Sequence, residues 1–517
     1  MNETLSTYRS TTDLFDSSRP TKKLALIEDL LSEFHLFDIR YCHWKSNEHL
    51  DASMLADTDL DILFDKAEKD KVEVILEQLN FKKFKSIPEK RYRDIEDFIG
   101  LDIQSGKIVH VHAHFRLTLG EIYLKSYQLN FEDQILDTRI YDESSGIFCI
   151  HPAFELILLY FREALKLRNR DALKLFFNKK VQHSASIRVE YNWLQKRVTD
   201  AESKAILESL FADPSVVLDL VTGKFSRKEL LTLSAFLKKE FRSQRMYDPV
   251  KAIFKRWYRE ISLKARRKLQ KVFNQPVLSR RVNPRGGFIV AVIGADGSGK
   301  SSVIADLHAT FKTKLDVYKI YFGRGDGKAS LFRKLLLNSK NKIRGNGKRI
   351  KILKPASGDV NKKGLLFNIY KCAEALSVAW EKKANLKRMQ KAKDRGMLVI
   401  CDRFPQNQIE GYNDGPLLGY FVKSRNFILR TISNLEKRIY ASANLHQPDL
   451  LFKLIADVDI VEARKPNETP RELLIAKIEG IKKLQLGNTE RVVTIDASLP
   501  FDMVIRKIKT DIWKAFP

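Results

Sequence analysis

The sequence predicts an α/β protein of two domains: a parallel sheet in the C-terminal half, preceded by a smaller α+β domain with a helical extension. An apolar run of strand length at 288–293 enters a glycine-rich turn, and a helical pattern beginning at Ser302 leaves it. Further strand-length runs alternate with helical patterns after it, as a parallel sheet requires. The chain has 517 residues, which is too many for one hydrophobic core.

Composition limits the partners of the chain without selecting one. The net charge of +28 attracts polyanions: nucleic acid, anionic lipid or phosphorylated substrates. The cysteines lack C-x-x-C spacing, which favours a reducing compartment and argues against a zinc site; they are Cys42, Cys149, Cys372 and Cys401. Residues 1–21 lack the pattern of a signal peptide, and no apolar run approaches the roughly 20 residues that span a bilayer. We expect a cytoplasmic protein, with peripheral binding at a membrane as an alternative.

The N-terminal part carries paired carboxylates on a predicted strand. A helix is expected over 22–37, and a strand over 58–64 places Asp59 and Asp61 on one face, away from Leu60 and Ile62. Two carboxylates on one face form a platform for a divalent metal; solvated turn acids are the alternative. His110, His112 and His114 also share the face of a strand. They could meet a metal or a phosphate, or form a purely structural ladder.

This arrangement resembles the nucleotidyltransferase superfamily over roughly 24–170. The resemblance implies that Asp59 and Asp61 hold Mg²⁺ against a nucleoside triphosphate, in a domain spanning 22–177. It also implies a third carboxylate from a later strand, a place that either Asp102 or His112 could take. Ser46-Asn47 stands where the superfamily carries Gly-Ser. A domain that binds nucleotide without turning it over is the alternative.

A helical extension is expected over 178–274. The helix at 152–177 has apolar residues on more than one face and should be buried, and further helices are predicted at 189–198, 202–211 and 228–241. A basic helix at 250–273 has an aromatic stripe. It could lie on an anionic membrane, or its stripe could pack on a neighbouring domain while the basic face is solvated. The linker 275–287, with Pro276, Pro284 and Gly286-Gly287, precedes the C-terminal domain 288–517.

The glycine-rich turn has the spacing G-x-x-x-x-G-K-S. Its residues are Gly294-Ala295-Asp296-Gly297-Ser298-Gly299-Lys300-Ser301, followed by Ser302. In such a loop the backbone N–H groups surround a phosphate, the lysine reaches the outer phosphates and the serine hydroxyl joins a Mg²⁺ shell. Because strand, loop and helix are all present, the sequence predicts an ATP and Mg²⁺ site. A glycine-rich turn with an incidental lysine is the alternative.

Later strands supply groups for an acceptor. A strand at 316–322 ends before Arg324, and the carboxyl ends of parallel strands gather ligands, so Arg324 should meet an acceptor anion. Residues 328–363 form an insert rich in Lys and Arg. A strand at 397–401 is followed by Asp402-Arg403-Phe404, and a fourth strand at 449–455 leads to a helix with Arg464 and Lys465. A fifth strand is expected at 492–496.

With these motifs the region 287–516 resembles the thymidylate kinase family of P-loop kinases. The resemblance implies that Asp296 contacts the acceptor's sugar, Asp402 joins the Mg²⁺ and water network, and Arg403 holds the acceptor phosphate. Arg464, Lys465 and Arg471 fall where the family has its basic lid. The family's R-E-P-G-G-T-like segment is replaced by residues 323–327. The domain order also resembles proteins associated with bacterial surface-polysaccharide synthesis.

The predicted function is therefore ATP- and Mg²⁺-dependent phosphoryl transfer to a nucleoside monophosphate or a sugar or glycan acceptor. Lys300, Asp402, Arg403 and Arg464 are the expected catalytic residues, because phosphoryl transfer depends on positioning and charge stabilisation. Asp296, Arg324 and Arg403 would bind the acceptor. The alternative is a nucleotide-gated scaffold or regulatory NTPase at an anionic membrane or on nucleic acid.

Overall fold

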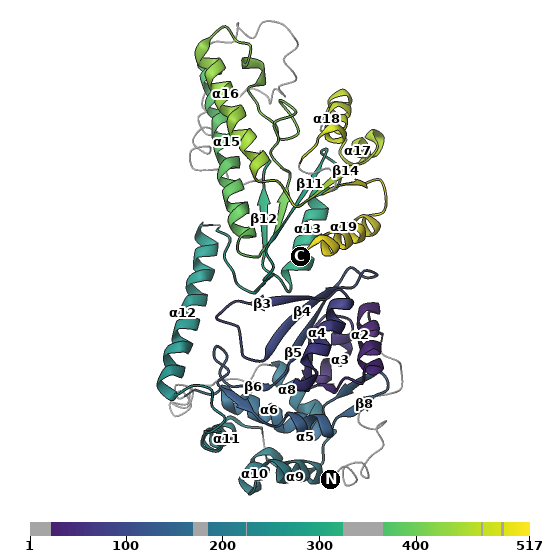
Figure 1. Ribbon diagram of the computed structural model, residues 1–517, viewed down its shortest axis with the longest axis vertical. Coiled ribbons are helices and arrows are strands. Elements are labelled where there is room, and N and C mark those ends of the chain that lie inside the picture. The colour runs from purple at the N-terminus through teal and green to yellow at the C-terminus, as the bar shows by residue number, and fades with distance from the viewer. Residues whose placement is uncertain are drawn as a thin grey trace. The chain divides into compact units, whose positions relative to one another are not determined.

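The computed structural model describes residues 22–168, 185–223, 225–273, 275–323, 365–466, 469–486 and 491–517. Two compact units divide the chain. The first comprises Met1–Phe273 with Ser279–Pro284, and the second comprises Asn274–Leu278 with Arg285–Pro517 (Figure 1). Each unit has its own sheet, so each is described by itself.

The first unit is built on a mixed sheet of eight strands. In spatial order these are β10 (Arg281–Val282), β3 (Lys82–Ser86), β4 (Ile95–Leu101), β5 (Ile108–His114), β2 (Leu60–Phe64), β1 (Tyr41–His43), β9 (Ile147–Cys149) and β8 (Ile140–Asp142). The β2–β5 and β1–β9 pairs are parallel, and the other pairs are antiparallel. The strand predicted at 58–64 is confirmed as β2, and the predicted strand with His110, His112 and His114 is confirmed as β5.

Alternation along β2 gives the sheet two different faces. Leu60, Ile62 and Phe64 join one core together with apolar residues of α2 (Ala25–Leu36), α3 (Leu50–Met54) and α4 (Lys69–Gln78). Successive strand residues point to opposite faces, so Asp61 lies on the side away from these helices. The predicted helix at 22–37 is confirmed as α2.

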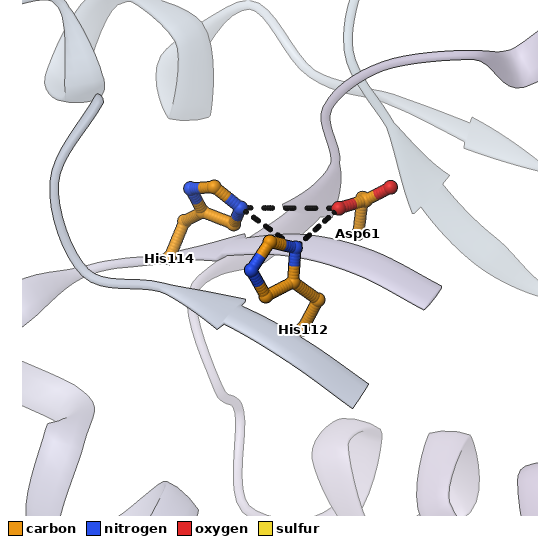
Figure 2. A group of neighbouring side chains, drawn as sticks. All are labelled: Asp61, His112 and His114. Carbon is orange, nitrogen blue, oxygen red and sulfur yellow. Dashed lines mark hydrogen bonds and ion pairs between the residues drawn. The ribbon is translucent and has the colours of Figure 1, made fainter. Parts of the chain in front are cut away.

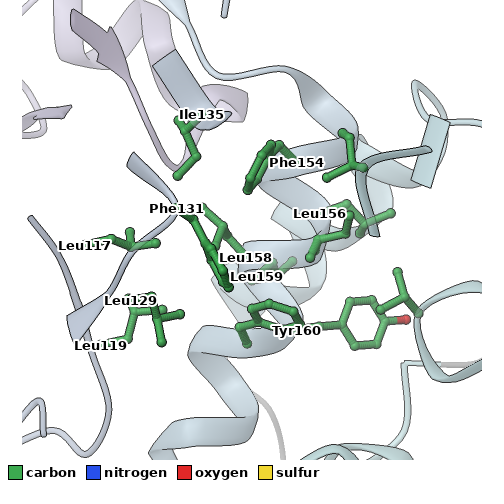
Figure 3. Close-up of a cluster of buried hydrophobic side chains, with 14 of the residues drawn as sticks. Leu117, Leu119, Leu129, Phe131, Ile135, Phe154, Leu156, Leu158, Leu159 and Tyr160 are labelled. Atoms are coloured by element: carbon green, nitrogen blue, oxygen red, sulfur yellow. The ribbon is translucent and has the colours of Figure 1, made fainter. Parts of the chain in front are cut away.

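A second core lies around a helix that is buried on almost every side. This helix, α6 (Pro152–Lys166), packs with β6 (Leu117–Leu119), β7 (Tyr127–Leu129) and α5 (Glu132–Asp137) (Figure 3). The same cluster includes residues of α8 (Ala185–Gln195), α9 (Asp200–Leu210), α10 (Ser215–Thr222) and α11 (Arg227–Glu240). Capping boxes begin α9 at Thr199 and α11 at Ser226. The short helix α10 was not predicted.

The long helix α12 (Pro249–Phe273) confirms the helix predicted at 250–273. Phe254 is 68% exposed and Trp257 is 57% exposed, whereas Arg259 is buried. Arg256 bonds to Glu121, and Arg259 bonds to the Tyr123 carbonyl of the same unit. Within the first unit, therefore, Phe254 and Trp257 are left uncovered, while Arg256 and Arg259 hold the helix to its own unit. Packing of the aromatic stripe on a neighbouring domain stays a prediction.

Part of the predicted linker belongs to the first unit. Within 275–287, β10 pairs antiparallel with β3, matching Arg281 to Ser86 and Val282 to Lys85. The Ile87 amide also donates to the Arg280 carbonyl at 3.0 Å. A two-residue strand has no periodicity to reveal it, and flanking prolines usually indicate a loop.

The second unit contains a five-stranded parallel sheet. The order is β12 (Val317–Tyr321), β13 (Leu398–Asp402), β11 (Phe288–Gly294), β14 (Leu450–Ile455) and β15 (Val492–Asp496). All four neighbouring pairs are parallel. The five strands predicted after residue 287 are therefore confirmed, as is the α/β class of this half. Arg324 and the insert 328–363 lie outside the described residues.

The described helices of the second unit connect these strands, except α19, which follows the last of them. They are α13 (Lys300–Lys312), α15 (Leu365–Lys393), α16 (Phe427–Ala441), α17 (Val458–Arg464), α18 (Arg471–Lys483) and α19 (Phe501–Ala515). Gly396 follows α15 with a φ of 78°, the left-handed conformation expected of a residue that ends a helix. No helix in the described part of the chain combines the length and the apolar composition needed to cross a bilayer.

Candidate functional site

The glycine-rich turn has the backbone of a phosphate-binding loop. It connects β11, which ends at Gly294, to α13, which begins at Lys300. Gly297 and Gly299 have φ angles of 91° and 86°, which side-chain-bearing residues rarely adopt. At Gly294 an added Cβ would lie 2.4 Å from Ser298 Oγ. The loop therefore requires glycine at these positions, and it places its amides at a helix N-terminus, where anions bind.

Lys300 is folded back over this loop. It is 6% exposed, and its Nζ donates to the Ala295 carbonyl at 2.5 Å. Burial and the nearby Arg403 charge lower the pKa of Lys300 to about 8. Ser301 and Ser302, in the first turn of α13, are exposed.

The neighbouring strand places an acid at the same carboxyl end of the sheet. β13 pairs with β11 so that Asp402 lies opposite Val292, two residues before Gly294. Asp402 is 9% exposed, and its carboxylate makes no hydrogen bond or ion pair with any side chain of the described ranges. Burial raises the pKa of Asp402. A buried carboxylate without a direct partner is suited to a cation shell.

Arg403 turns the chain sharply at the end of β13. Its φ of 69° is strained for a residue with a side chain, and its amide donates to the Val292 carbonyl at 3.0 Å. The guanidinium binds Asp296 at 2.7 Å and lies 3.5 Å from Asp414. The structure thus brings together Asp296 and Arg403, two residues 107 positions apart that the sequence assigned to the acceptor.

Three further charged residues of this site were not predicted from the sequence: Lys382, Asp414 and Lys477. Lys477 on α18 binds Asp296 at 2.8 Å, so Asp296 lies between two cations. Although burial opposes it, Lys477 and Arg403 hold the pKa of Asp296 well below its usual range. Lys382 on α15 donates to the Asp414 carbonyl at 2.9 Å, and both groups are buried. None of the three lies in a recognisable motif, and only the buried side of α15 could have indicated Lys382.

A small pocket lies beside this network. It is lined by Ile293, Gly294, Arg403, Asn413, Asp414, Ile481 and Leu484. Its walls combine an arginine, an amide and a carboxylate with aliphatic side chains. In this conformation the pocket has room for about one water molecule.

Two of the three predicted lid residues, Arg464 and Arg471, have other partners. Arg464, the last residue of α17, donates to the Ala497 carbonyl at 3.0 Å. Arg471, the first residue of α18, binds Asp459 and Glu462 at 2.6 and 2.5 Å. In this conformation neither guanidinium contacts a residue of the phosphate loop.

The predicted metal platform of the first unit has a different arrangement from the one expected. Asp61 pairs in register with His112, whose Nδ1 lies 2.8 Å from Asp61 Oδ1. Asp59 instead lies 3.0 Å from His110 Nδ1. Each aspartate therefore has its own imidazole, and the shared Mg²⁺ position stays a prediction, as does nucleotidyl transfer.

Of the two proposed third ligands, the structure gives Asp102 a structural role. Its carboxylate accepts bonds from the Ser105 amide and hydroxyl and from the Leu26 amide, at 2.6 to 3.0 Å. Asp102 thus stabilises the β4–β5 turn. His112 occupies the place beside Asp61, and His114 lies 3.3 Å from His112 (Figure 2). Burial lowers the pKa of His112 and of His114.

Sequence reasoning missed the remaining charges on this face. Asp97 on β4 pairs with His112 in register and contacts His110 and Arg281, at 3.0 and 2.8 Å. Lys45 Nζ lies 2.9 Å from Asp61 Oδ1. Although burial opposes it, the Lys45 ammonium holds the pKa of Asp61 well below its usual range. Burial and Lys45 lower the pKa of Lys125 to about 7.

The substituted glycine position keeps the backbone of a glycine. Ser46 has a φ of 60°, in the left-handed region. The next residue, Asn47, donates from its side chain to the buried Glu155 at 2.7 Å. Burial is the main cause that raises the pKa of Glu155 to about 7. The turn after β1 is therefore held by Glu155 of α6.

Comparison with known proteins gives distant matches. No protein-family model matches the chain. It is 25% identical over 224 residues to the uncharacterized ATP-binding protein YghR of Escherichia coli, a match covering 42% of this chain and 84% of the relative. It is 25% identical over 223 residues to the uncharacterized ATP-binding protein YghS of the same species, covering 42% and 89%. A solved structure of thymidylate kinase from Candida albicans is similar at a TM-score of 0.27 and 16% identity, covering 44% of this chain and 90% of that one.

Proposed function

We propose that the second unit transfers the γ-phosphoryl group of ATP to a phosphate-bearing acceptor, a nucleoside monophosphate or a sugar derivative. One observation carries this proposal. The phosphate loop with buried Lys300 follows β11, and Asp402 and Arg403 lie where the neighbouring parallel strand β13 ends. Both groups are therefore at the carboxyl end of the sheet. Donor and acceptor phosphates could therefore meet between these groups.

The donor side is supported by the loop and by the relatives. Both Escherichia coli proteins are named as ATP-binding, and the loop of this chain has the glycine backbone that such binding requires. Lys300 would leave the Ala295 carbonyl and reach the outer phosphates. Ser301 and Asp402 would hold Mg²⁺, since both are oxygen donors and the Asp402 carboxylate lacks a direct partner among the described side chains.

The acceptor side would be organised by Arg403. Its guanidinium is fixed by Asp296 and Asp414, and it borders the small pocket. An arginine held on two carboxylates is preorganised to bind a phosphate. Arg464 would complete the site if ligand binding brings it near, and the role of Arg324, which lies outside the described residues, stays a prediction. Positive groups held in place before the reaction stabilise charge on the transferred phosphoryl group.

The test measures ADP release by the full chain with Mg²⁺-ATP and a panel of nucleoside monophosphates and phosphorylated or free sugars. A kinase gives ADP and phosphorylated acceptor in equal amounts, and only with its acceptor. Asp402→Asn should lower this rate by about 10²-fold or more, because the metal shell loses a charge. Slow ADP release that no acceptor changes would instead indicate a nucleotide-gated scaffold.

A further inference from the structure

Two histidines and an aspartate in the first unit converge on one point. Asp61 Oδ1 on β2 lies 2.8 Å from His112 Nδ1 and 3.8 Å from His114 Nε2, both on β5. The two ring nitrogens are 3.3 Å apart. Figure 2 shows both imidazoles directed at the same carboxylate oxygen. All three side chains are at most 18% exposed, so their relative positions are set by packing.

These separations fit the ligand shell of a transition metal. Nitrogen and oxygen ligands about 2.0–2.1 Å from a tetrahedral zinc ion lie about 3.3 Å from one another. The three distances observed here are centred on that value. Three protein ligands would leave a coordination position open, the arrangement of catalytic rather than structural zinc sites.

The donor types favour a different metal from the one the sequence predicted. Imidazoles prefer Zn²⁺, Co²⁺ or Fe²⁺, whereas Mg²⁺ prefers oxygen ligands. The cysteine spacing that argued against zinc does not bear on histidine ligands. We propose that Asp61, His112 and His114 form a site for a divalent transition metal, with an open position for water or an anionic ligand.

Lys45 makes this proposal testable in two directions. Its ammonium binds the same Asp61 oxygen at 2.9 Å and would compete with a metal for it. Removing a ligand should therefore weaken metal binding, whereas removing Lys45 should strengthen it. A histidine ladder that is only structural would respond to neither change.

The experiment uses the full chain, stripped of metal by a chelator and titrated with Zn²⁺, and separately with Co²⁺ followed by its visible absorption. One equivalent should bind, and Asp61→Asn and His112→Asn should each weaken affinity at least about tenfold. Lys45→Met should tighten it. His49→Gln is the matched control, since His49 is 48% exposed and outside the cluster. Thermal melts confirm folding of each variant.

Several outcomes would overturn the metal site. These are no binding of either metal by the wild-type chain at micromolar concentration, equal affinity in the ligand variants, and unchanged affinity in Lys45→Met. Equal competition by Mg²⁺ would also overturn it and would favour the two-carboxylate platform. Because the wild-type titration alone can reject the proposal, it stays testable even if a variant fails to fold.

An independent observation concerns the outward face of α12. Six of its apolar side chains are 57–68% exposed: Val250, Phe254, Trp257, Tyr258, Ile261 and Val272. Spacings of three, four and eleven residues place them on one side of the helix. Its other side is held to the first unit by Arg256, Arg259 and Ser262, which bind Glu121, the Tyr123 carbonyl and Glu89.

The charges beside this apolar face are positive. Lys251, Lys264, Arg267 and Lys268 are exposed, and the single acid of the helix, Glu260, is paired with Lys264 and Arg168. A helix with exposed aromatic residues flanked by cations is complementary to an anionic bilayer, where rings enter the interface and cations meet headgroups. We propose that this face docks the full chain on anionic lipid.

The test is flotation of the full chain with neutral vesicles and with vesicles containing roughly a third phosphatidylglycerol. Binding should require the anionic lipid and weaken in high salt. Phe254→Ser with Trp257→Ser should lower binding at least about tenfold, as should Lys264→Ser with Lys268→Ser. Leu445→Ser is the control, because this leucine is 80% exposed elsewhere. Equal binding to neutral vesicles, no binding, or burial of the face in a dimer by sedimentation would each overturn the proposal.

Discussion

At the scale of single residues, the phosphate-binding site combines a paired carboxylate, Asp296, with two buried groups, Lys300 and Asp402, that are not paired with any side chain in the described part of the chain. Lys300 and Asp402 are at most 9% exposed, and Asp296 lies between Arg403 and Lys477. Ionised groups in such surroundings are costly unless they have partners of opposite charge. Bound ATP would add negative charge to this site, and its metal would add positive charge. Substitutions here should therefore affect ligand binding and turnover more than folding.

Lys300→Ala should lower turnover by about 10²–10³-fold, because the developing phosphoryl charge loses its ammonium partner. The melting temperature should change little, because the substitution also removes the free-energy cost of burying a cation. Acceptor-dependent ADP release and calorimetry measure the two effects. A folded variant with wild-type turnover would contradict the assignment of this site.

ATP affinity should depend on pH through Lys300. The pKa of about 8 in the free chain lies below its ordinary value of 10.5, so the ammonium is lost as pH rises through 8. Between pH 7 and 9 the fraction able to bind phosphate falls roughly tenfold, and the apparent Kd should rise by that factor. Between pH 8 and 10.5 the unfolded chain binds more protons than the folded chain does. The free energy of unfolding therefore rises with pH in this window, because the cost of burying the Lys300 ammonium disappears as the group loses its proton.

Titration of Mg²⁺-ATP at pH 7, 8 and 9 tests this dependence. The Lys300→Ala chain should bind more weakly at pH 7 and show an almost flat profile. An equally steep profile in that variant would assign the titration to another group.

At the scale of elements, β10 depends on contacts that no local pattern shows. β10 adds an edge strand to the first unit from beyond α12, and its Arg281 binds Asp97 at 2.8 Å. Although burial opposes it, the bond from His110 and the Arg281 charge hold the pKa of Asp97 well below its usual range. The strand thus supports the face that carries the histidine cluster.

A fragment of residues 1–284 should therefore be more stable than a fragment of residues 1–278. Loss of β10 removes the ion pair of a carboxylate that is 7% exposed, which we expect to cost on the order of 3 kcal/mol. For a domain of this size the melting temperature should fall by several degrees. Arg281→Ala in the longer fragment should reproduce most of the difference; equal melting of all three would mean that β10 contributes nothing to stability.

At the scale of the whole molecule, the chain consists of two units that each have a complete sheet and core. The boundary is interleaved, since Asn274–Leu278 belongs to the second unit and Ser279–Pro284 to the first. All five strands of the parallel sheet follow Arg285. Such units usually fold by themselves.

A fragment of residues 285–517 should fold alone and bind ATP with an affinity within about threefold of the full chain. The reason is that its phosphate loop, its sheet and the Asp402–Arg403 turn all lie within it. Circular dichroism and ATP titration measure this, with the Lys300→Ala fragment as control. An insoluble fragment, or one that does not bind ATP, would show that residues before Arg285 complete the fold.

The sequence by itself determined the local elements and the phosphate loop. Strand runs such as 288–293 and glycine spacing are short-range patterns, and the backbone angles of Gly297 and Gly299 follow from the loop they form. The strands β11 to β15 and the helices α2, α6 and α12 could be predicted for the same reason. Of the phosphate site, the loop, Asp402 and Arg403 were accessible because they lie in contiguous motifs.

Only the tertiary structure decided which distant residues meet. Lys477 binds Asp296 across 181 positions, and Lys45 and His112 meet at Asp61 through the order of strands in the sheet. Helical periodicity shows that α12 has an apolar side but not which side its unit covers, because that depends on partners such as Glu121. Burial, and hence the charge of groups such as Lys300, is likewise a property of the assembled fold.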